Sequence, residues 1–122
     1  MAEAKIKSLL PSLRERKRYL AYEVVSGIKF NDALHVNKAI VEAAKEFLGN
    51  LGMARAGIIT MSDQWNADAQ RGLIRVNNKQ VDELKASLAF VRSIDGNDAV
   101  VRSVGASGIL KKSRQKYLYT AK

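Results

Sequence analysis

The sequence predicts an α+β protein, because segments with strand-like alternation and segments with helical spacing follow one another in the order strand, helix, strand, strand, helix, strand. This order predicts a ferredoxin-like or RRM-like βαββαβ sandwich, with a four-stranded antiparallel sheet, two helices on one sheet face and a short C-terminal helix. The chain has 122 residues, 47% of them hydrophobic, which suits a single domain over residues 1–122. We expect the core to occupy about residues 12–110, with residues 1–11 and 113–122 mobile or peripheral.

The first strand is expected from about Arg18 to Gly27, directly after a cluster of basic residues. Side chains of a strand point alternately to its two faces, and one face of a strand that covers a core is apolar. Here Leu20, Tyr22 and Val24 share one face. A charge cluster fixed to the end of a core strand meets a partner in a defined geometry, whereas a loose tail does not.

A first helix is expected after Asn31 and Asp32, which are good N-cap residues, and before Gly49, which is expected to stop it. Its apolar residues recur at helical spacing: Val36, Ile40, Ala43, Ala44 and Phe47. A loop then leads to a second strand over about residues 54–63, and the polar residues 65–70 are expected to connect a hairpin.

The third strand is expected over Arg71–Asn77, and Asn78 can cap the second helix that follows. The apolar stripe of that helix has helical spacing: Val81, Leu84, Leu88 and Val91. Residues 95–98 are expected to form a turn before the fourth strand over about residues 99–107, and the basic residues 110–118 are expected to form the last short helix.

The net charge of +9 is concentrated at the two ends of the chain. Residues 1–18 carry six Lys/Arg against two Glu, residues 19–98 carry nine against ten acidic residues, and residues 99–122 carry six against none. This distribution favours a surface that binds a polyanion, most often nucleic acid. Two solvated tails are the simpler alternative, and neither end has the pattern of an amphipathic helix that binds an acidic membrane.

The predicted topology joins the two basic ends. Strand 4 lies antiparallel beside strand 1, so the start of one adjoins the end of the other. The third strand is also antiparallel to the first, so its far end points to the same edge. We therefore expect one basic patch of RNA-binding residues: Arg14, Arg16, Lys17, Arg18, Arg75, Lys111, Lys112, Arg114 and Lys116.

Signals for catalysis or metal binding are weak, and we predict no catalytic residue and no metal ligand. The chain has no cysteine, no apolar run of transmembrane length and no signal-peptide core, so a cytoplasmic protein is expected. His35 is expected to be exposed or capping, and Asp63 and Asp68 are expected to be solvated in a loop. Arg75 and Asn77 on one strand are compatible with an acylphosphatase, but the Gly-rich phosphate loop of that family is missing after the first strand.

The predicted sheet is a poor platform for stacking bases. RRM domains stack bases on aromatic residues of the two central strands, and the third strand here contains none. Tyr22 is expected in the core. Binding is therefore expected to depend on phosphate contacts from Lys and Arg, which are salt-sensitive and carry little sequence information.

Three blocks of the sequence, in the same order, resemble the archaeal ribonuclease P protein component 2 family, the counterpart of a eukaryotic RNase P and MRP subunit. They are residues 10–19 (LPSLRERKRY), residues 72–77 (GLIRVN) and residues 101–112 (VRSVGASGILKK). Together they span most of residues 10–112. Residues 1–9 and 113–122 lie outside the blocks and inherit nothing from the resemblance.

The resemblance implies a non-catalytic subunit of the ribonucleoprotein endonuclease that removes the 5′ leader from precursor tRNA. It implies RNase P RNA as the main partner, with precursor tRNA contacted indirectly. It also implies another RNase P protein subunit of barrel-like fold, and it is compatible with a homodimer within a heterotetramer. No cofactor is expected on the protein, since the magnesium ions belong to the RNA.

Two other functions are compatible with the sequence. A stand-alone RRM-like module would bind short single strands, and a small ferredoxin-like enzyme or regulatory domain would act on a small molecule. Several residues have structural alternatives as well. Arg75 could pair with Glu23 across strands, Arg102 could be an ion-pair or protein-interface residue, and Phe30 and Trp65 could serve protein contacts or ordinary packing.

Overall fold

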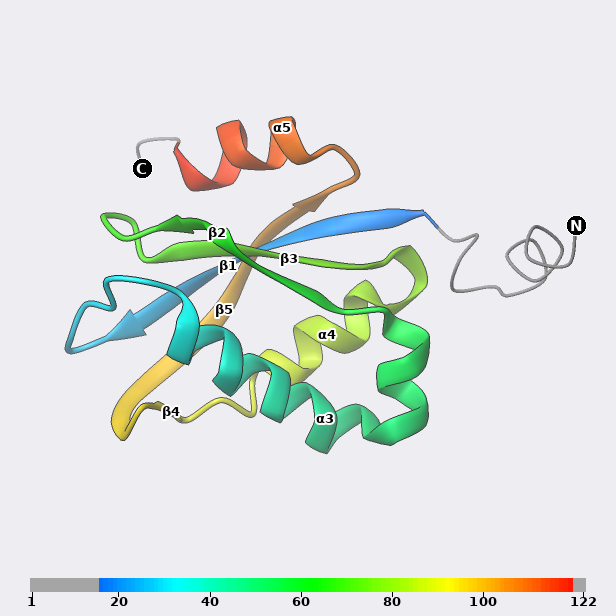
Figure 1. Cartoon of the computed structure of the whole chain (residues 1–122), viewed down its shortest axis with the longest axis horizontal. Helices are drawn as coiled ribbons and strands as arrows, with labels where there is room; N and C mark the ends of the chain where they lie inside the picture. The colour runs from blue at the N-terminus through cyan, green and yellow to red at the C-terminus, as the bar shows by residue number, and fades with distance from the viewer. Residues whose placement is uncertain (1–15, 120–122) are drawn as a thin grey trace, which may run out of the picture.

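The computed structural model describes residues 16–119, which form five strands and three α-helices (Figure 1). Along the chain these elements are β1 (Lys17–Ser26), α3 (Leu34–Ala56), β2 (Ile59–Asn66), β3 (Arg71–Asn77), a 3₁₀ turn (Asn78–Gln80), α4 (Val81–Leu88), β4 (Ser93–Ile94), β5 (Asn97–Ser107), α5 (Leu110–Ser113) and a π-helical turn (Arg114–Leu118). We refer to residues 110–118, the last two elements together, as the C-terminal helix.

The sheet has the strand order β2-β3-β1-β5-β4, and each neighbouring pair is antiparallel. The predicted α+β class is confirmed, with β1 and β3 inside the sheet, but the predicted count of four strands is wrong. The extra strand is β4, which pairs with the start of β5 through a tight hairpin. Asp95 and Gly96 both have positive φ values, 52° and 80°, and an Asp-Gly pair in this conformation allows a two-residue hairpin.

Helix α3 continues past Gly49, where the sequence predicted a stop. Gly49 adopts a non-helical conformation with φ 73° and ψ 178°, so it kinks the helix rather than ending it. The helix ends at Gly57, which is left-handed and donates its backbone N–H to the carbonyl of Met53 at 3.3 Å. Strand β2 consequently begins at Ile59 instead of Ala54 and runs on to Asn66. Ala56 is buried in the core after the kink, and this burial stabilises the added turns.

Helices α3 and α4 cover one face of the sheet and enclose the main core (Figure 1). The predicted inward residues of β1 are buried there against the helices. Most of the residues predicted from helical spacing are buried as well: Val36, Ile40, Ala43, Ala44, Leu84, Leu88 and Val91. Val81 is only half-buried against this core, and Ile74 and Val76 of β3 are buried in it. Phe47 was also expected on the inner face of the first helix, but it is 45% exposed and its ring lies 5.2 Å from that of Phe90.

The C-terminal helix lies on the opposite face of the sheet, as Figure 1 shows for α5. Leu118 is 1% exposed and forms a small second core with Ala21 and Leu73. The ring of Tyr117 packs so closely on Gly105 that a Cβ atom at that position would lie 2.4 Å from it. Residues 113–118, expected to be mobile or peripheral, therefore pack as part of the fold.

Candidate nucleic-acid interface

The strand register brings the two basic ends of the described chain to one edge of the sheet. Tyr19 pairs with Ser107, so the start of β1 adjoins the end of β5. A Cβ atom on Gly108 would lie 3.9 Å from the carbonyl oxygen of Lys17. Lys111 and Lys112 follow within one turn and are exposed. The predicted meeting of the two charge clusters is confirmed for residues 16–119, and Arg14 lies outside the described residues.

Strand β3 adds Arg75 to this edge, because Arg75 pairs with Tyr19 and Asn77 pairs with Lys17. The Lys17 ammonium donates to the Oδ1 atom of Asn77, and the Asn77 amide donates to the carbonyl of Arg55 at 2.6 Å. Asn77 is fully buried, so its side chain ties the basic strand to the end of α3. We call Arg16, Lys17, Arg75, Lys111 and Lys112 the basic edge.

Two of the predicted residues lie farther from this edge than expected. The C-terminal helix runs from the basic edge toward the start of β3, where the carbonyl of Tyr117 accepts a hydrogen bond from Arg71. Arg114 and Lys116 are exposed along this helix, over the rings of Tyr119 and Tyr117 at 5.7 and 5.6 Å. The positive charge thus forms a stripe along the helix rather than one compact cluster.

Arg18 points to the other face of the sheet, since it has the strand parity of Leu20 and the buried core. It is half-buried, and its Nε atom has no hydrogen-bond partner among the described residues. The Nε atom of Arg75 is likewise buried without a partner within residues 16–119.

Glu23 pairs with Arg71 and Arg102, not with Arg75. The Nε atom of Arg71 lies 3.4 Å from Oε2 of Glu23, and Nη2 of Arg102 lies 2.5 Å from Oε1. Burial raises the pKa of the Glu23 carboxyl, but hydrogen bonds and charge attraction from Arg102 and then Arg71 outweigh it and leave the pKa below its ordinary value. Arg102 is therefore an ion-pair partner, one of the two roles that its sequence position allowed.

The aromatic residues do not form a stacking platform in the described structure. Tyr22 is buried as predicted, and its hydroxyl donates to Oδ1 of Asn37 at 2.9 Å. Burial raises the pKa of Tyr22 far above its ordinary value. The indole of Trp65 donates to the carbonyl of Phe30 at 3.1 Å, and Phe30 itself is buried, so both serve packing. The C-terminal helix occupies the sheet face on which RRM domains stack bases.

The other residues that the sequence offered as site candidates, His35, Asp63 and Asp68, are exposed. The side chain of His35 is 51% exposed, and its Nδ1 atom lies 3.9 Å from a carboxylate oxygen of Asp95. No group of three His, Cys, Asp or Glu side chains within residues 16–119 could hold a metal ion, and Asp63 and Asp68 take part in none. Among the helices in that range, none is both long and apolar enough to cross a membrane.

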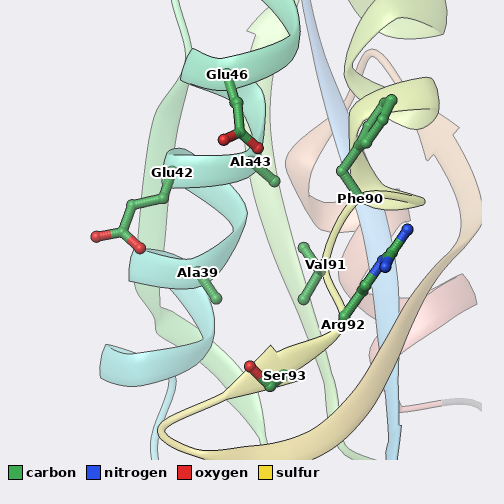
Figure 2. Close-up of a pocket in the computed structure, with 8 residues that line it drawn as sticks. All are labelled: Ala39, Glu42, Ala43, Glu46, Phe90, Val91, Arg92 and Ser93. Atoms are coloured by element: carbon green, nitrogen blue, oxygen red, sulfur yellow. The ribbon is translucent and has the colours of Figure 1, made fainter.

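A shallow hollow of about 300 Å³ lies between α3 and the segment that follows α4 (Figure 2). Ala39, Ala43 and Val91 line it, and Glu42, Glu46 and Arg92 bring charges to it. It is on the helix-covered side of the sheet and contains none of the residues predicted to bind RNA. Its mixed charges give no basis for a polyanion site.

Sequence reasoning missed the residues that fix the C-terminal helix in place. Arg71 and Asn66 both donate to carbonyl oxygens of its last turn. A signal was present, since Leu110, Tyr117 and Leu118 share helical spacing within an otherwise basic stretch. That pattern indicates a helix with a buried side.

Comparison with known proteins agrees with this architecture. The model of the Rpp14/Pop5 family matches residues 18–118. The chain belongs to the Rpp14/Pop5 family. The match includes all five strands except the first residue of β1, and it extends through the C-terminal helix.

Relatives in this family cover nearly the whole chain. A protein of Thermococcus gammatolerans named Ribonuclease P protein component 2 is 38% identical over 93% of this chain and 92% of its own length. Proteins of the same name from Pyrococcus furiosus and Methanosarcina acetivorans are 36% and 33% identical over 92% and 93% of this chain, and over 91% and 82% of their own lengths. A chain in a structure titled Cryo-EM structure of yeast Ribonuclease MRP has the same fold, with a TM-score of 0.58 at 17% identity over 83% of this chain and 85% of that chain.

Proposed function

We propose that the protein is a non-catalytic subunit of ribonuclease P that supports the catalytic RNA in removing the 5′ leader from precursor tRNA. The observation that carries this proposal is similarity over more than nine-tenths of the chain to proteins named Ribonuclease P protein component 2. The site is compatible with that role, because it offers cations on a rigid frame rather than a set of reactive groups.

The physical contribution of such a subunit is electrostatic. RNA helices that pack together bring phosphates close, and fixed Lys and Arg side chains offset the repulsion and release counterions. The basic edge and the C-terminal helix present these cations from two docked elements, so less magnesium is needed to fold the RNA. In this proposal the magnesium ions belong to the RNA, and the protein binds no cofactor.

The proposed partners bind on different sides of the sheet. RNase P RNA lies against the basic edge and the C-terminal helix, and precursor tRNA is contacted indirectly. A second RNase P protein subunit, of barrel-like fold, binds the helix-covered side, where Phe47 and Phe90 are 45% and 51% exposed beside the hollow of Figure 2. A homodimer within a heterotetramer in the cytoplasm is the assembly that we propose.

The test is reconstitution of 5′ processing with the RNA and the other protein subunits, measured as a function of magnesium concentration. We expect the wild-type chain to permit processing at lower magnesium. Arg16→Gln, Lys111→Gln and Lys112→Gln together remove three exposed cations and should weaken RNA binding on the order of tenfold, with a shallower dependence on salt.

The matched control removes three exposed cations from the helix-covered side, Lys38→Gln, Lys45→Gln and Lys85→Gln. It changes the net charge equally and should leave RNA binding by the isolated chain close to that of the wild type, and the isolated chain is compared because the second protein subunit is proposed to bind this side. Equal losses in the two triple variants would show a non-specific charge effect and overturn the proposed surface. Tight binding of short single strands by the isolated chain, with a modest salt dependence, would favour a stand-alone RNA-binding module instead.

A further inference from the structure

We infer that Glu23 is a positioning residue, which acts through Arg71 to hold the C-terminal helix in the orientation that presents its cations to RNA. This inference rests on the proposed function for its RNA partner. The inference gives a structural role to the Glu23 carboxylate, whose negative charge would by itself weaken phosphate binding on a basic surface.

The carboxylate of Glu23 lies between two guanidinium groups. Glu23 is directly opposite Arg71 on β3 and Arg102 on β5, so the strand register alone brings the three side chains to one face. Arg102 donates from Nε to Oε1 at 2.6 Å, and Arg71 approaches Oε2 with its Nε at 3.4 Å. The side chains of Glu23 and Arg71 are each only 18% exposed, whereas that of Arg102 is 65% exposed.

Arg71 connects this ion pair to the C-terminal helix. Its Nη1 atom donates to the backbone carbonyl of Tyr117 at 2.8 Å, while its Nε atom faces Glu23. The last carbonyls of a helix have no partner within the helix, so a fixed cation there satisfies one and interacts favourably with the helix dipole. Asn66 donates to the next carbonyl, that of Leu118. The end of the helix is thus held by polar groups from β2 and β3.

Apolar packing fixes both ends of the C-terminal helix on the sheet, and the polar contacts from Asn66 and Arg71 act at its last turn. Near its start, Leu110 packs on the second core, and near its end Leu118 is buried and Tyr117 covers Gly105. The exposed cations, including Arg114 and Lys116, lie between these contacts. Apolar packing keeps the helix on the sheet, and the Glu23–Arg71 pair sets the position of its last turn.

Two opposing effects make the test decisive. Glu23→Gln removes a negative charge from an RNA-binding surface, and long-range electrostatics alone would tighten RNA binding. Loss of the helix position would instead weaken RNA binding. We expect the full chain with Glu23→Gln, assembled with the RNA and the other subunits, to bind about threefold to tenfold more weakly, with faster amide hydrogen exchange at residues 114–118.

Three further variants separate positioning from charge and from general damage. Arg71→Lys keeps the net charge but loses the planar fork that contacts Glu23 and Tyr117 together, so it should reproduce the loss. Arg102→Gln leaves the bridge through Arg71 in place, so it should leave hydrogen exchange at residues 114–118 unchanged. Asp98→Asn, an exposed carboxylate at the start of β5, is the matched control for charge and should bind RNA at least as tightly as the wild type.

The outcomes distinguish this inference from the proposed function. If the wild-type chain binds no RNase P RNA, the proposed function fails, yet hydrogen exchange in Glu23→Gln still tests the positioning. Binding by Glu23→Gln as tight as that of the wild type, or unchanged exchange at residues 114–118, overturns the inference while leaving the proposed function intact. Should Glu23→Gln fold poorly, the charge-neutral Arg71→Lys decides the question through the same two measurements.

Discussion

The two faces of the sheet are covered in different ways. On one face, two helices bury large apolar side chains such as Leu20, Ile40 and Leu84 in the main core. On the other face, one short helix covers Ala21 and Leu73 with three of its own residues, Leu110, Tyr117 and Leu118. Polar contacts from Asn66 and Arg71 then hold its end. The first face is held by many apolar contacts, whereas the second is held by a few apolar contacts and by hydrogen bonds at the end of the C-terminal helix.

This difference separates stability from function. Loss of the main core unfolds the domain, because burial of apolar surface is the dominant stabilising term. The second face contributes less to folding, and it presents most of the cations proposed to bind RNA. Variants on the first face should therefore alter unfolding most, and variants on the second face should alter RNA binding with a smaller loss of stability.

The largest expected effect is on the first face. Ile40 is fully buried between α3 and the sheet, and Ile40→Ala removes three carbon atoms from a packed core. We expect the free energy of unfolding to fall by about 3 kcal/mol, measured by urea denaturation. RNA affinity of the remaining folded fraction should be unchanged. A weaker affinity at full folding would show that the two faces are coupled more closely than the contacts indicate.

A smaller effect is expected from Gly105→Ala on the second face. The added Cβ would meet the ring of Tyr117 at 2.4 Å, so the ring and the end of the C-terminal helix must shift. We expect a loss of about 1–2 kcal/mol in unfolding free energy, together with weaker RNA binding and faster proteolysis within residues 110–118. Gly27→Ala is the control, because nothing lies within 4 Å of its added Cβ. If both variants behave alike, the helix is not held by this contact.

The sequence predicted the parts of the fold that depend on local pattern. The bounds of β3, Arg71–Asn77, agree with the prediction, because a short run of alternating apolar and polar residues between polar turns indicates a strand and not a helix. The meeting of the two basic ends also followed from topology alone. Contacts of specific side chains with RNA stay a prediction, since nothing in the fold reports on them.

The errors arose where tertiary contacts override local signals. Gly49 resembles a helix stop, but the chain resumes its helix after the kink, where Ala56 is buried. The partner of Glu23 depends on strand register: Arg71 stands directly opposite it, and Arg75 stands opposite Tyr19. A two-residue strand such as β4 is too short to have a pattern.

The smallest expected effect concerns acid pH and Glu23. The folded pKa of this carboxyl is lowered from its ordinary value of 4.5, so its contribution to stability is complete above that value and is lost as the pH falls through the folded pKa. Protonation removes the attraction to Arg71 and loosens the last turn of the C-terminal helix before the main core responds. We expect amide exchange at residues 114–118, corrected for its intrinsic pH dependence, to speed up relative to the core below about pH 4. Glu23→Gln should lack this change, and a variant that retained it would assign the acid response to another carboxylate.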